Sequence, residues 1–326
     1  MTSPSLWIVK IMATIGIALA ILISVACTRP QPPVRVGTVP WPPYDLLELA
    51  SEEHRLDPDI VELIHLETPA EVVRAFRYEL IDAMLVTSHF ALSAGSTLPG
   101  TRIIYFVDVS VGGDALLARP EIKNASDLRG KRVGIEAAPL GTYTLTRALQ
   151  ILDVDRKHID IVEVDTPEHY EAFATGRIDA LVTYDPVRAR LVEEGANQLF
   201  GSEQIPFEII DVIVARSEVI EDRPLALAAL INAFSAGIQE FRNNPGAARA
   251  LAERHGLSPE AYLNSLESVQ LYDLDQNLEF FADPEGPVQQ GLLEQCNIMV
   301  NQGLLVRAPA LDPLLDASIA DLADQL

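Results

Sequence analysis

Aromatic and acidic side chains at the ends of predicted strands are the residues best suited to bind a ligand. Trp41 and Tyr44 follow the first predicted strand, and prolines on both sides of Trp41 stiffen its loop. A rigid aromatic ring at a strand end can stack on a planar or cationic group. Carboxylates at such positions can accept the N–H groups of an amine or a heterocycle. Four aspartates occupy predicted strand ends or the entries to predicted connecting strands: Asp108, Asp114, Asp185 and Asp211.

Hydroxyl groups and one helix start complete the candidate site. Gly141 and Thr142 open a predicted helix, whose free backbone N–H groups can hold a carboxylate, a sulfonate or water without any cation. A Thr142 that only caps its helix is the alternative. His89 follows two hydroxyl side chains at a strand end, and its alternative role is a surface or capping residue. The candidate ligand-binding residues are Trp41, Tyr44, Thr87, Ser88, His89, Asp114, Gly141, Thr142, Tyr184, Asp185 and Asp211.

The balance of charges around these positions favours a nitrogen-bearing ligand. Arg188 and Arg190 fall inside a predicted helix, where we expect them to face solvent. An oxoanion site normally contains a cation or a denser set of donors. We therefore expect an amine-bearing or heterocyclic ligand, with a nitrate-, sulfonate- or taurine-type oxoanion as the alternative.

An internal repeat indicates how these residues are positioned. The chain matches itself at an offset of 97 residues, with 11 identities over positions 35–86. Arg35-Val36-Gly37 recurs as Arg132-Val133-Gly134, and Ile81-Asp82-Ala83 recurs as Ile178-Asp179-Ala180. Each copy alternates short β-branched runs with helical periods, which is typical of parallel sheets covered by helices. Predicted strands occupy 34–39, 59–66, 83–87, 132–135, 159–164 and 180–183, with further strand-like runs at 109–118 and 209–215.

Two α/β lobes with a double connection are the predicted architecture. The runs at 109–118 and 209–215 can each carry the chain from one lobe to the other. Beyond residue 216 the apolar spacing becomes helical, with predicted helices at 225–243, 247–255, 259–269 and 286–305. We expect residues 34–110 and 215–326 to form one lobe and residues 111–214 to form the other with the hinge strands. Parallel sheets bind ligands outside the carboxyl ends of their strands, so the site is expected between the lobes.

An ordered set of segments resembles one family of proteins. The segments are Val36 to Tyr44, Asp114 to Pro120, Asp127 to Gly134 and Tyr184 to Arg188, together with the pair Ala75-Phe76 and the triplet Ile81-Asp82-Ala83. They resemble the SsuA/THI5-like, or NMT1-like, solute-binding proteins of ABC importers for nitrate, sulfonates, taurine and thiamine precursors. The resemblance implies a type II periplasmic-binding-protein fold with a doubly crossed hinge. It also implies a small-molecule solute held in the cleft, no cofactor, and an ABC permease as partner of a monomeric protein.

The N-terminus predicts export and a lipid anchor. No acidic residue precedes Cys27, and an uncharged stretch runs from Ile11 to Ala26. This pattern indicates a secretory signal over 1–26. The end of the stretch, Ser24-Val25-Ala26-Cys27, resembles a bacterial lipobox, which implies lipidation of Cys27 and a Pro-rich linker over 27–33. The protein would then be extracytoplasmic and attached to a membrane, and an uncleaved anchor helix is the alternative.

Composition and missing motifs exclude other functions. Lys and Arg number 24 against 47 Asp and Glu, a net charge of −23 that argues against nucleic-acid partners. The histidines show no metal-protease spacing, and no G-x-S-x-G turn is present. The same superfamily includes a pyrimidine synthase with a Cys-rich iron-binding motif, which is absent here because Cys27 and Cys296 are the only cysteines. We therefore expect no enzyme activity and no metal, a buried role for Cys296, and a ligand sensor as a further alternative.

Overall fold

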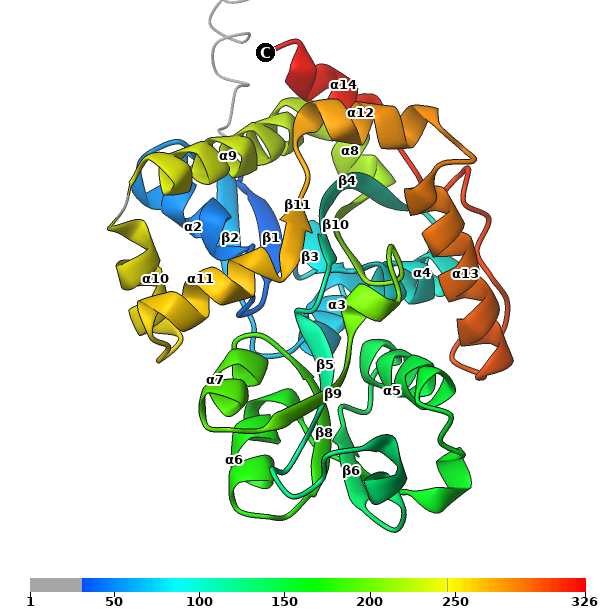
Figure 1. Cartoon of the computed structure of the whole chain (residues 1–326). Coiled ribbons are helices and arrows are strands. Elements are labelled where there is room, and N and C mark those ends of the chain that lie inside the picture. Colours follow the sequence, from blue (N-terminus) through cyan, green and yellow to red (C-terminus); the bar gives the residue numbers. More distant parts are fainter. Residues whose placement is uncertain (1–30, 245) are drawn as a thin grey trace, which may run out of the picture. The chain divides into compact units, whose positions relative to one another are not determined.

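Two β-sheets organise the computed structural model, which describes residues 31–244 and 246–326. The unit Val34–Leu326 contains two α/β lobes, one built on each sheet (Figure 1). The first sheet has the strand order β11 (Val269–Leu271), β4 (Thr101–Ser110), β10 (Ile210–Arg216), β3 (Ala83–Thr87), β1 (Val34–Thr38) and β2 (Val61–His65). The second has the order β7 (Asp160–Glu163), β6 (Arg132–Ile135), β8 (Ala180–Tyr184), β5 (Asp114–Ala118) and β9 (Asn197–Gly201).

Each sheet combines a parallel half with antiparallel strands. β1 pairs parallel with β2 and β3, and β6 pairs parallel with β7 and β8. β10 lies antiparallel to β3, and β5 lies antiparallel to β8. The predicted strand–helix alternation is therefore present, and the fold is that of two α/β lobes.

The helices cover both faces of the sheets (Figure 1). In the second lobe they are α5 (Pro139–Ile151), α6 (His169–Ala174) and α7 (Val187–Glu193). The helices that start the first lobe are α2 (Asp45–Glu52), α3 (Pro69–Arg77) and α4 (Ser88–Thr97). The C-terminal helices are α8 (Ser217–Asp222), α9 (Pro224–Asn243), α10 (Ala247–Arg254), α11 (Pro259–Glu267), α12 (Leu274–Ala282), α13 (Pro287–Asn301) and α14 (Ser318–Asp324).

The same ion pair closes both copies of the repeat. Arg35 donates from its backbone N and from Nε and Nη2 to Asp82, at 2.9, 3.0 and 2.7 Å. Arg132 makes the three equivalent bonds to Asp179 at 2.9, 3.0 and 2.7 Å. In each copy this pair joins the first strand to the turn before the third strand. The sequence match at the 97-residue offset therefore reflects a shared local structure.

The chain passes between the lobes twice. One passage lies between β4 and β5, where the predicted strand 109–118 is in fact two strands separated by a turn at Val111–Gly113. Gly112 requires this break, because its φ of +115° is strained for residues with a side chain. The other passage runs from β9 to β10. Ser202 on the second passage bonds to the Ser110 hydroxyl and the Gly112 N–H, both at 2.7 Å, so the two passages support each other.

The C-terminal helices form the outer layer of the first lobe. Within the described residues, one helix, α9, is long and apolar enough to cross a membrane, but half of its apolar segment is buried in the domain. It packs against α2 and α14 as a core helix of this lobe. Cys296 on α13 is buried, as expected, and burial raises the pKa of its thiol to about 11. The predicted secretory signal over 1–26 and the predicted lipidation of Cys27 lie outside the described residues.

Candidate functional site

A small cavity lies where the carboxyl ends of the parallel strands of both lobes meet. Its volume is about 30 Å³, and a water molecule needs about 10–15 Å³ by this kind of measure, so it holds about two waters. None of the described residues around it is a Lys, Arg or His. The lining residues are Val39, Trp41, Tyr44, Pro69, Val86, Thr87, Asp114, Leu140, Tyr184 and Asp211.

Asp114 and Asp211 enter this cavity from equivalent positions in the two lobes. They stand 97 residues apart, which is the offset of the repeat. Asp211 is paired with Thr87 of β3, and Asp114 is paired with Tyr184 of β8, so the registers also correspond. Each lobe thus places one carboxyl beside the passage between the lobes. Both side chains are buried.

Burial without a basic partner keeps these carboxyls partly protonated. It raises the pKa of Asp114 to about 8 and that of Asp211 to about 6. The Tyr44 hydroxyl donates to Asp211 at 2.6 Å, which opposes the effect of burial at Asp211. Carboxyls in this state can ionise when a positive group enters the cavity, because the new charge favours the carboxylate.

A third acid, Asp108, lies behind the cavity on the neighbouring strand. It pairs with Asp211 across β4 and β10, is fully buried, and neither of its carboxyl oxygens has a hydrogen-bond partner. Burial and the negative charge of Asp211 hold the pKa of Asp108 well above its usual range. The indole Nε1 of Trp41 is buried beside these two carboxyls and favours their ionised forms, although it lies outside hydrogen-bond geometry with either. Unpaired buried polar atoms next to a cavity mark places where a ligand or water can bond.

Aromatic rings form the walls of the cavity. Trp41 and Tyr184 come from different lobes and meet edge to face, with ring centroids 6.1 Å apart. A Cβ at Gly113 would lie 3.0 Å from Trp41, so the ring also packs against the turn between the lobes. The predicted residues Trp41, Tyr44, Thr87, Tyr184 and the two aspartates are therefore brought together.

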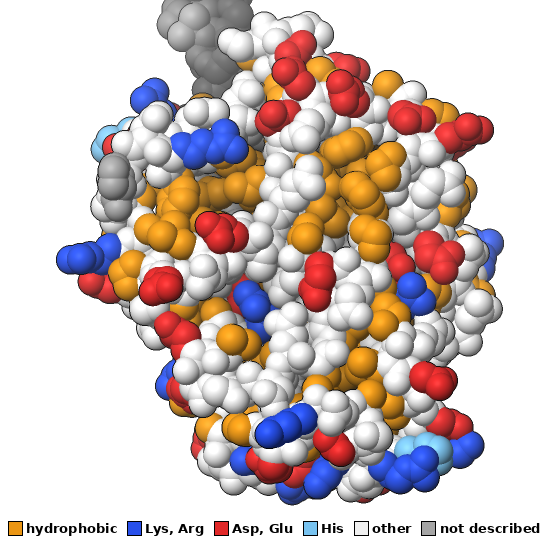
Figure 2. Space-filling view, viewed as in Figure 1, with side chains coloured by type: hydrophobic (Ala, Val, Ile, Leu, Met, Phe, Trp, Pro, Cys, Tyr) orange, Lys and Arg blue, Asp and Glu red, His pale blue; other side chains and the backbone are white. Residues whose placement is uncertain are grey.

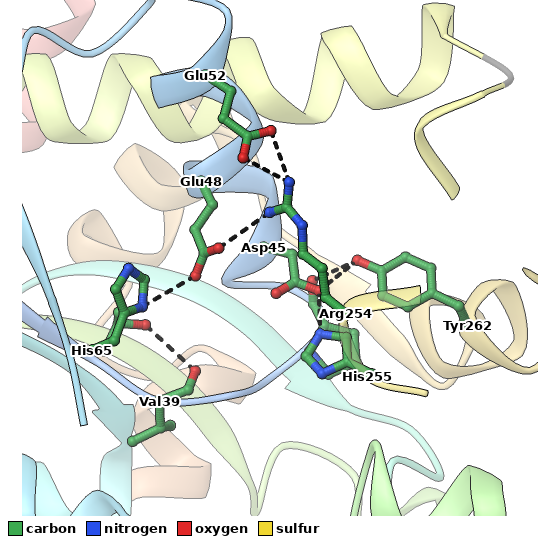
Figure 3. A network of polar contacts seen from close by, with 10 residues as sticks. Val39, Asp45, Glu48, Glu52, His65, Arg254, His255 and Tyr262 are labelled. Carbon is green, nitrogen blue, oxygen red and sulfur yellow. Dashed lines mark hydrogen bonds and ion pairs between the residues drawn. The ribbon is translucent and has the colours of Figure 1, made fainter. Parts of the chain in front are cut away.

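A polar network fixes the start of the helix that follows the Trp41 loop (Figure 3). The buried carboxylate of Asp45 receives His255 Nε2 at 2.7 Å and the Tyr262 hydroxyl at 2.8 Å. The Tyr262 hydroxyl also lies 3.3 Å from the carbonyl oxygen of Pro42, inside the loop itself. On the next turn of α2, Arg254 reaches Glu48 and Glu52. Helices α10 and α11 thereby hold the loop that presents Trp41.

Asp185 does not line this cavity but lies in an adjacent cleft, whose walls also include Val39 and Tyr184, and its carboxylate is fixed by several donors. Its carboxylate receives Arg188 Nη2 at 2.9 Å, the backbone N–H of Ala189 at 2.9 Å and the hydroxyl of Ser268 at 3.2 Å. The expectation that Arg188 faces solvent is wrong, because its side chain is only 11% exposed. The i, i+3 spacing on α7 turns Arg188 back onto Asp185, and a buried carboxylate needs such a partner.

Four further predicted residues do not line this cavity: Ser88, His89, Gly141 and Thr142. The Ser88 hydroxyl donates to Gln295 at 2.6 Å and is fully buried towards α13. His89 is buried against Tyr143 with ring centroids 4.3 Å apart; neither ring nitrogen has a partner, and burial lowers its pKa to about 3. The N–H of Thr142 bonds within α5 to the Ala138 carbonyl. Leu140, one residue before Gly141, is the part of this helix start that lines the cavity.

Sequence reasoning missed Glu136 and Val39, which directly follow the first strand of each copy. They are equivalent at the 97-residue offset. Val39 lines the cavity, and Glu136 is a buried acid beside it. Following the repeat one residue beyond each strand would have identified both. Within the described residues, no group of three or more His, Cys, Asp or Glu could hold a metal ion.

Comparisons with known proteins agree with this architecture. A model of the NMT1/THI5-like family matches residues 83–248. The taurine-binding periplasmic protein of Escherichia coli K12 is 24% identical over 248 residues, which cover 73% of this chain and 76% of that protein. The alkanesulfonate-binding protein SsuA of Xanthomonas axonopodis pv. citri, solved with bound MOPS, superimposes with a TM-score of 0.72. It is 17% identical over 89% of this chain and 99% of its own.

An enzyme shares the same fold. The desulfurization enzyme DSZB superimposes with a TM-score of 0.66 and 18% identity, over 90% of this chain and 99% of its own. At 18% identity the similarity between the two proteins shows a common fold. The function follows from the residues of the site and not from the fold.

Proposed function

Since the chain belongs to the NMT1/THI5-like family, we propose that it is an extracytoplasmic solute-binding protein of an ABC importer. It captures a small amine-bearing or heterocyclic solute between its two lobes and delivers it to a permease. Residues 34–110 and 215–326 would form the first lobe, and residues 111–214 would form the second lobe with the hinge strands. A lipidated Cys27 after cleavage of residues 1–26 would tether a monomeric protein to the membrane.

The observation that carries the solute class is the pair of aspartates in the cavity. Asp114 and Asp211 line it with Trp41, Tyr44 and Tyr184, and no cation among the described lining residues balances them. A positively charged nitrogen would supply this balance and could lie against the aromatic walls. On the face shown in Figure 2 acidic residues lie among basic ones, and the buried acids Asp185 and Glu208 each pair with an arginine, so buried carboxyls without a basic partner are distinctive.

An oxoanion-type solute is the second candidate, and the taurine-binding relative favours it. Taurine contains both an ammonium and a sulfonate group, so an aminosulfonate could use the same aspartates for its nitrogen. A sensor that reports to a signalling partner would use the same site with a different partner.

Calorimetry with a defined panel tests the solute class. The panel contains alkylamines, an aminopyrimidine, taurine, ethanesulfonate and nitrate, and native mass spectrometry of the purified protein identifies any solute that remains bound. Asp114→Asn should weaken binding of an amine by about tenfold or more, because a charge-assisted hydrogen bond is lost. Asp160→Asn, at an exposed acid of the same lobe, is the control and should bind as the wild type does. Tight binding of nitrate or ethanesulfonate with no binding of any amine would refute the amine-bearing class.

A further inference from the structure

Glu136 lies against the start of α5, at the edge of the cleft in the second lobe. A Cβ at Gly141 would lie 2.7 Å from Glu136 Cγ and 2.8 Å from the Glu136 carbonyl oxygen, so the first turn of α5 packs directly on this residue. Gly141 is required for this close approach. Burial raises the pKa of Glu136 to about 7, and the Thr166 hydroxyl, 3.2 Å from Oε2, and the backbone N–H of Gly141 partly offset this by stabilising the carboxylate.

Few donors at this helix start remain for another anion. Pro139, the first residue of α5, has no N–H, and the N–H of Thr142 is bonded to the Ala138 carbonyl. Among the first four residues of α5, the N–H groups that remain are those of Leu140 and Gly141. The N–H of Gly141 already stabilises the carboxylate of Glu136. The positive end of the helix is thus next to an internal carboxyl, which is the kind of group that a helix start stabilises.

One carboxylate oxygen of Glu136, Oε1, has no hydrogen-bond partner in the described part of the chain. The residue is buried, with 6% of its surface exposed. Its negative charge acts on Asp114 and on Tyr184, which both line the cavity. The carboxyl therefore adjoins the solute cavity with one oxygen unpaired.

The two lobes differ at this point. The equivalent of Glu136 in the first lobe is Val39, which presents an apolar side chain to the cavity. At this position, then, the second lobe has an acid that the first lobe does not have. The lobes also differ at Trp41, whose equivalent in the second lobe is Ala138. At the position of Val39 and Glu136 the first lobe therefore adds an apolar side chain, and the second lobe adds a carboxyl.

We propose that Glu136 is a specificity-determining residue whose carboxylate takes the place of an anion at the start of α5, so that the second lobe accepts a cationic group and rejects an oxoanion. The inference rests on the proposed function and narrows it to cations without an acidic group, in preference to aminosulfonates. An ionised Glu136 opposes the entry of a second negative charge into this buried site, so the selection is strongest above about pH 7, where the carboxyl is ionised, and the titrations that test it are made at about pH 8.5.

Three matched two-carbon compounds test the inference by calorimetry: ethylamine, taurine and ethanesulfonate. We expect the wild type to prefer ethylamine to taurine and to show the weakest binding for ethanesulfonate. Glu136→Gln keeps the shape of the side chain and removes its charge. In this variant ethylamine should bind about tenfold more weakly, and taurine and ethanesulfonate should bind at least about tenfold more tightly. Glu163→Gln, at an exposed acid that ends the adjacent strand β7, is the matched control and should leave the order unchanged.

The outcomes separate this inference from the proposed function. If the wild type prefers taurine and Glu136→Gln does not change the ratio of the three affinities, the inference is wrong while solute binding stands. If neither protein binds any of the three compounds, the inference is also wrong, and native mass spectrometry of the wild type decides the proposed function independently. Thermal unfolding of Glu136→Gln shows whether the variant is folded at the temperature of the titration.

Discussion

Asp114, Asp211 and Glu136 have pKa values that burial raises to about 8, about 6 and about 7, so part of the cleft is protonated at neutral pH. A cationic solute favours the ionised carboxylates and must therefore displace protons when it binds. This chemistry connects three residues from different strands to one observable property, the pH dependence of binding.

We expect the affinity for an amine to rise as the pH increases from about 5 to about 8. Each proton released on binding contributes up to about a tenfold change in affinity per pH unit. Calorimetry in two buffers with different ionisation enthalpies measures the number of protons released. Asp114→Asn should flatten the upper part of the profile, from about pH 6.5 to about pH 8. A pH-independent affinity over this range would contradict a role for these carboxyls in binding.

The same shifts predict the stability of the ligand-free protein. Because the folded-state pKa values exceed the unfolded values of about 4, the folded state binds more protons than the unfolded state between those values. Its free energy of unfolding should therefore fall as the pH rises from about 4 to about 8. The midpoint of thermal unfolding of the soluble domain, measured across this range, checks the sign, with Asp114→Asn again showing a smaller change.

Trp41 provides a spectroscopic test of the aromatic wall. The chain has two tryptophans, Trp7 and Trp41, so a protein that starts after residue 26 reports only on Trp41. Its emission should change when a solute enters, because the indole is buried and its Nε1 is unpaired. Trp41→Phe retains a ring but loses the N–H, and should weaken binding by about 1 kcal/mol, the usual contribution of one hydrogen bond. If this variant binds solute with unchanged affinity, the indole N–H does not bond to the solute.

Single residues differed in how far the sequence could place them. Asp114 and Asp211 were predictable because their positions at strand ends follow from the alternation of strands and helices. The role of Ser88 was not predictable, because its partner Gln295 is 207 residues away. Such a contact depends on how the C-terminal helices pack on the first lobe, and a local pattern contains no information about that packing. Asp185 also receives a bond from Ser268, 83 residues away, but its ionic partner Arg188 is a local i, i+3 neighbour, and the charged side chain alone predicted exposure to solvent.

Elements that repeat were easier to predict than elements that occur once. The strands around Arg35 and Arg132 carry the same residues because each copy needs the same ion pair to Asp82 or Asp179. Strand β9 and helix α12 were missed. β9 contains Asn, Gln and Gly among its five residues, so neither its hydrophobicity nor its β-propensity indicates a strand. Pairing with β5 forms it.

The ion pair between Arg188 on α7 and the buried Asp185 allows the loss of stability on leaving a buried carboxylate without its cation to be measured. Arg188→Ala removes the cationic partner of Asp185, which is completely buried. We expect the free energy of unfolding to fall by about 3–5 kcal/mol, measured by urea denaturation. Arg190→Ala is the matched control on the same helix, because Arg190 is exposed, pairs with the exposed Glu194 and lies over the ring of Tyr170, and its loss should change stability by about 1 kcal/mol or less. Equal effects of the two substitutions would mean that Asp185 does not depend on Arg188.

At the scale of the whole domain, the small cavity implies that a solute enters only when the lobes separate. A volume of about 30 Å³ is too small for any member of the proposed solute class. Contacts between the lobes must break and re-form during entry. One of them joins α7 of the second lobe to α11 of the first, where the Ser258 hydroxyl donates to Glu193 at 2.7 Å. Apolar side chains from both lobes, including Ala189 and Tyr262, pack together beside this bond.

Ser258 allows this interface to be weakened without damage to the helix that carries it. Its hydroxyl also accepts the N–H of Ala261 as the N-cap of α11, and both Asp and Asn serve equally well as N-caps. Ser258→Asp places a negative charge opposite Glu193, whereas Ser258→Asn does not. Because both positions are exposed, we expect the Asp variant to bind solute about two- to fivefold more weakly than the Asn variant. Small-angle scattering should show a larger radius of gyration for the Asp variant. Adding Glu193→Gln to the Asp variant should restore both the affinity for solute and the radius of gyration. If the two variants bind alike, this contact does not contribute to closure, and the apolar cluster around Tyr262 becomes the element to test.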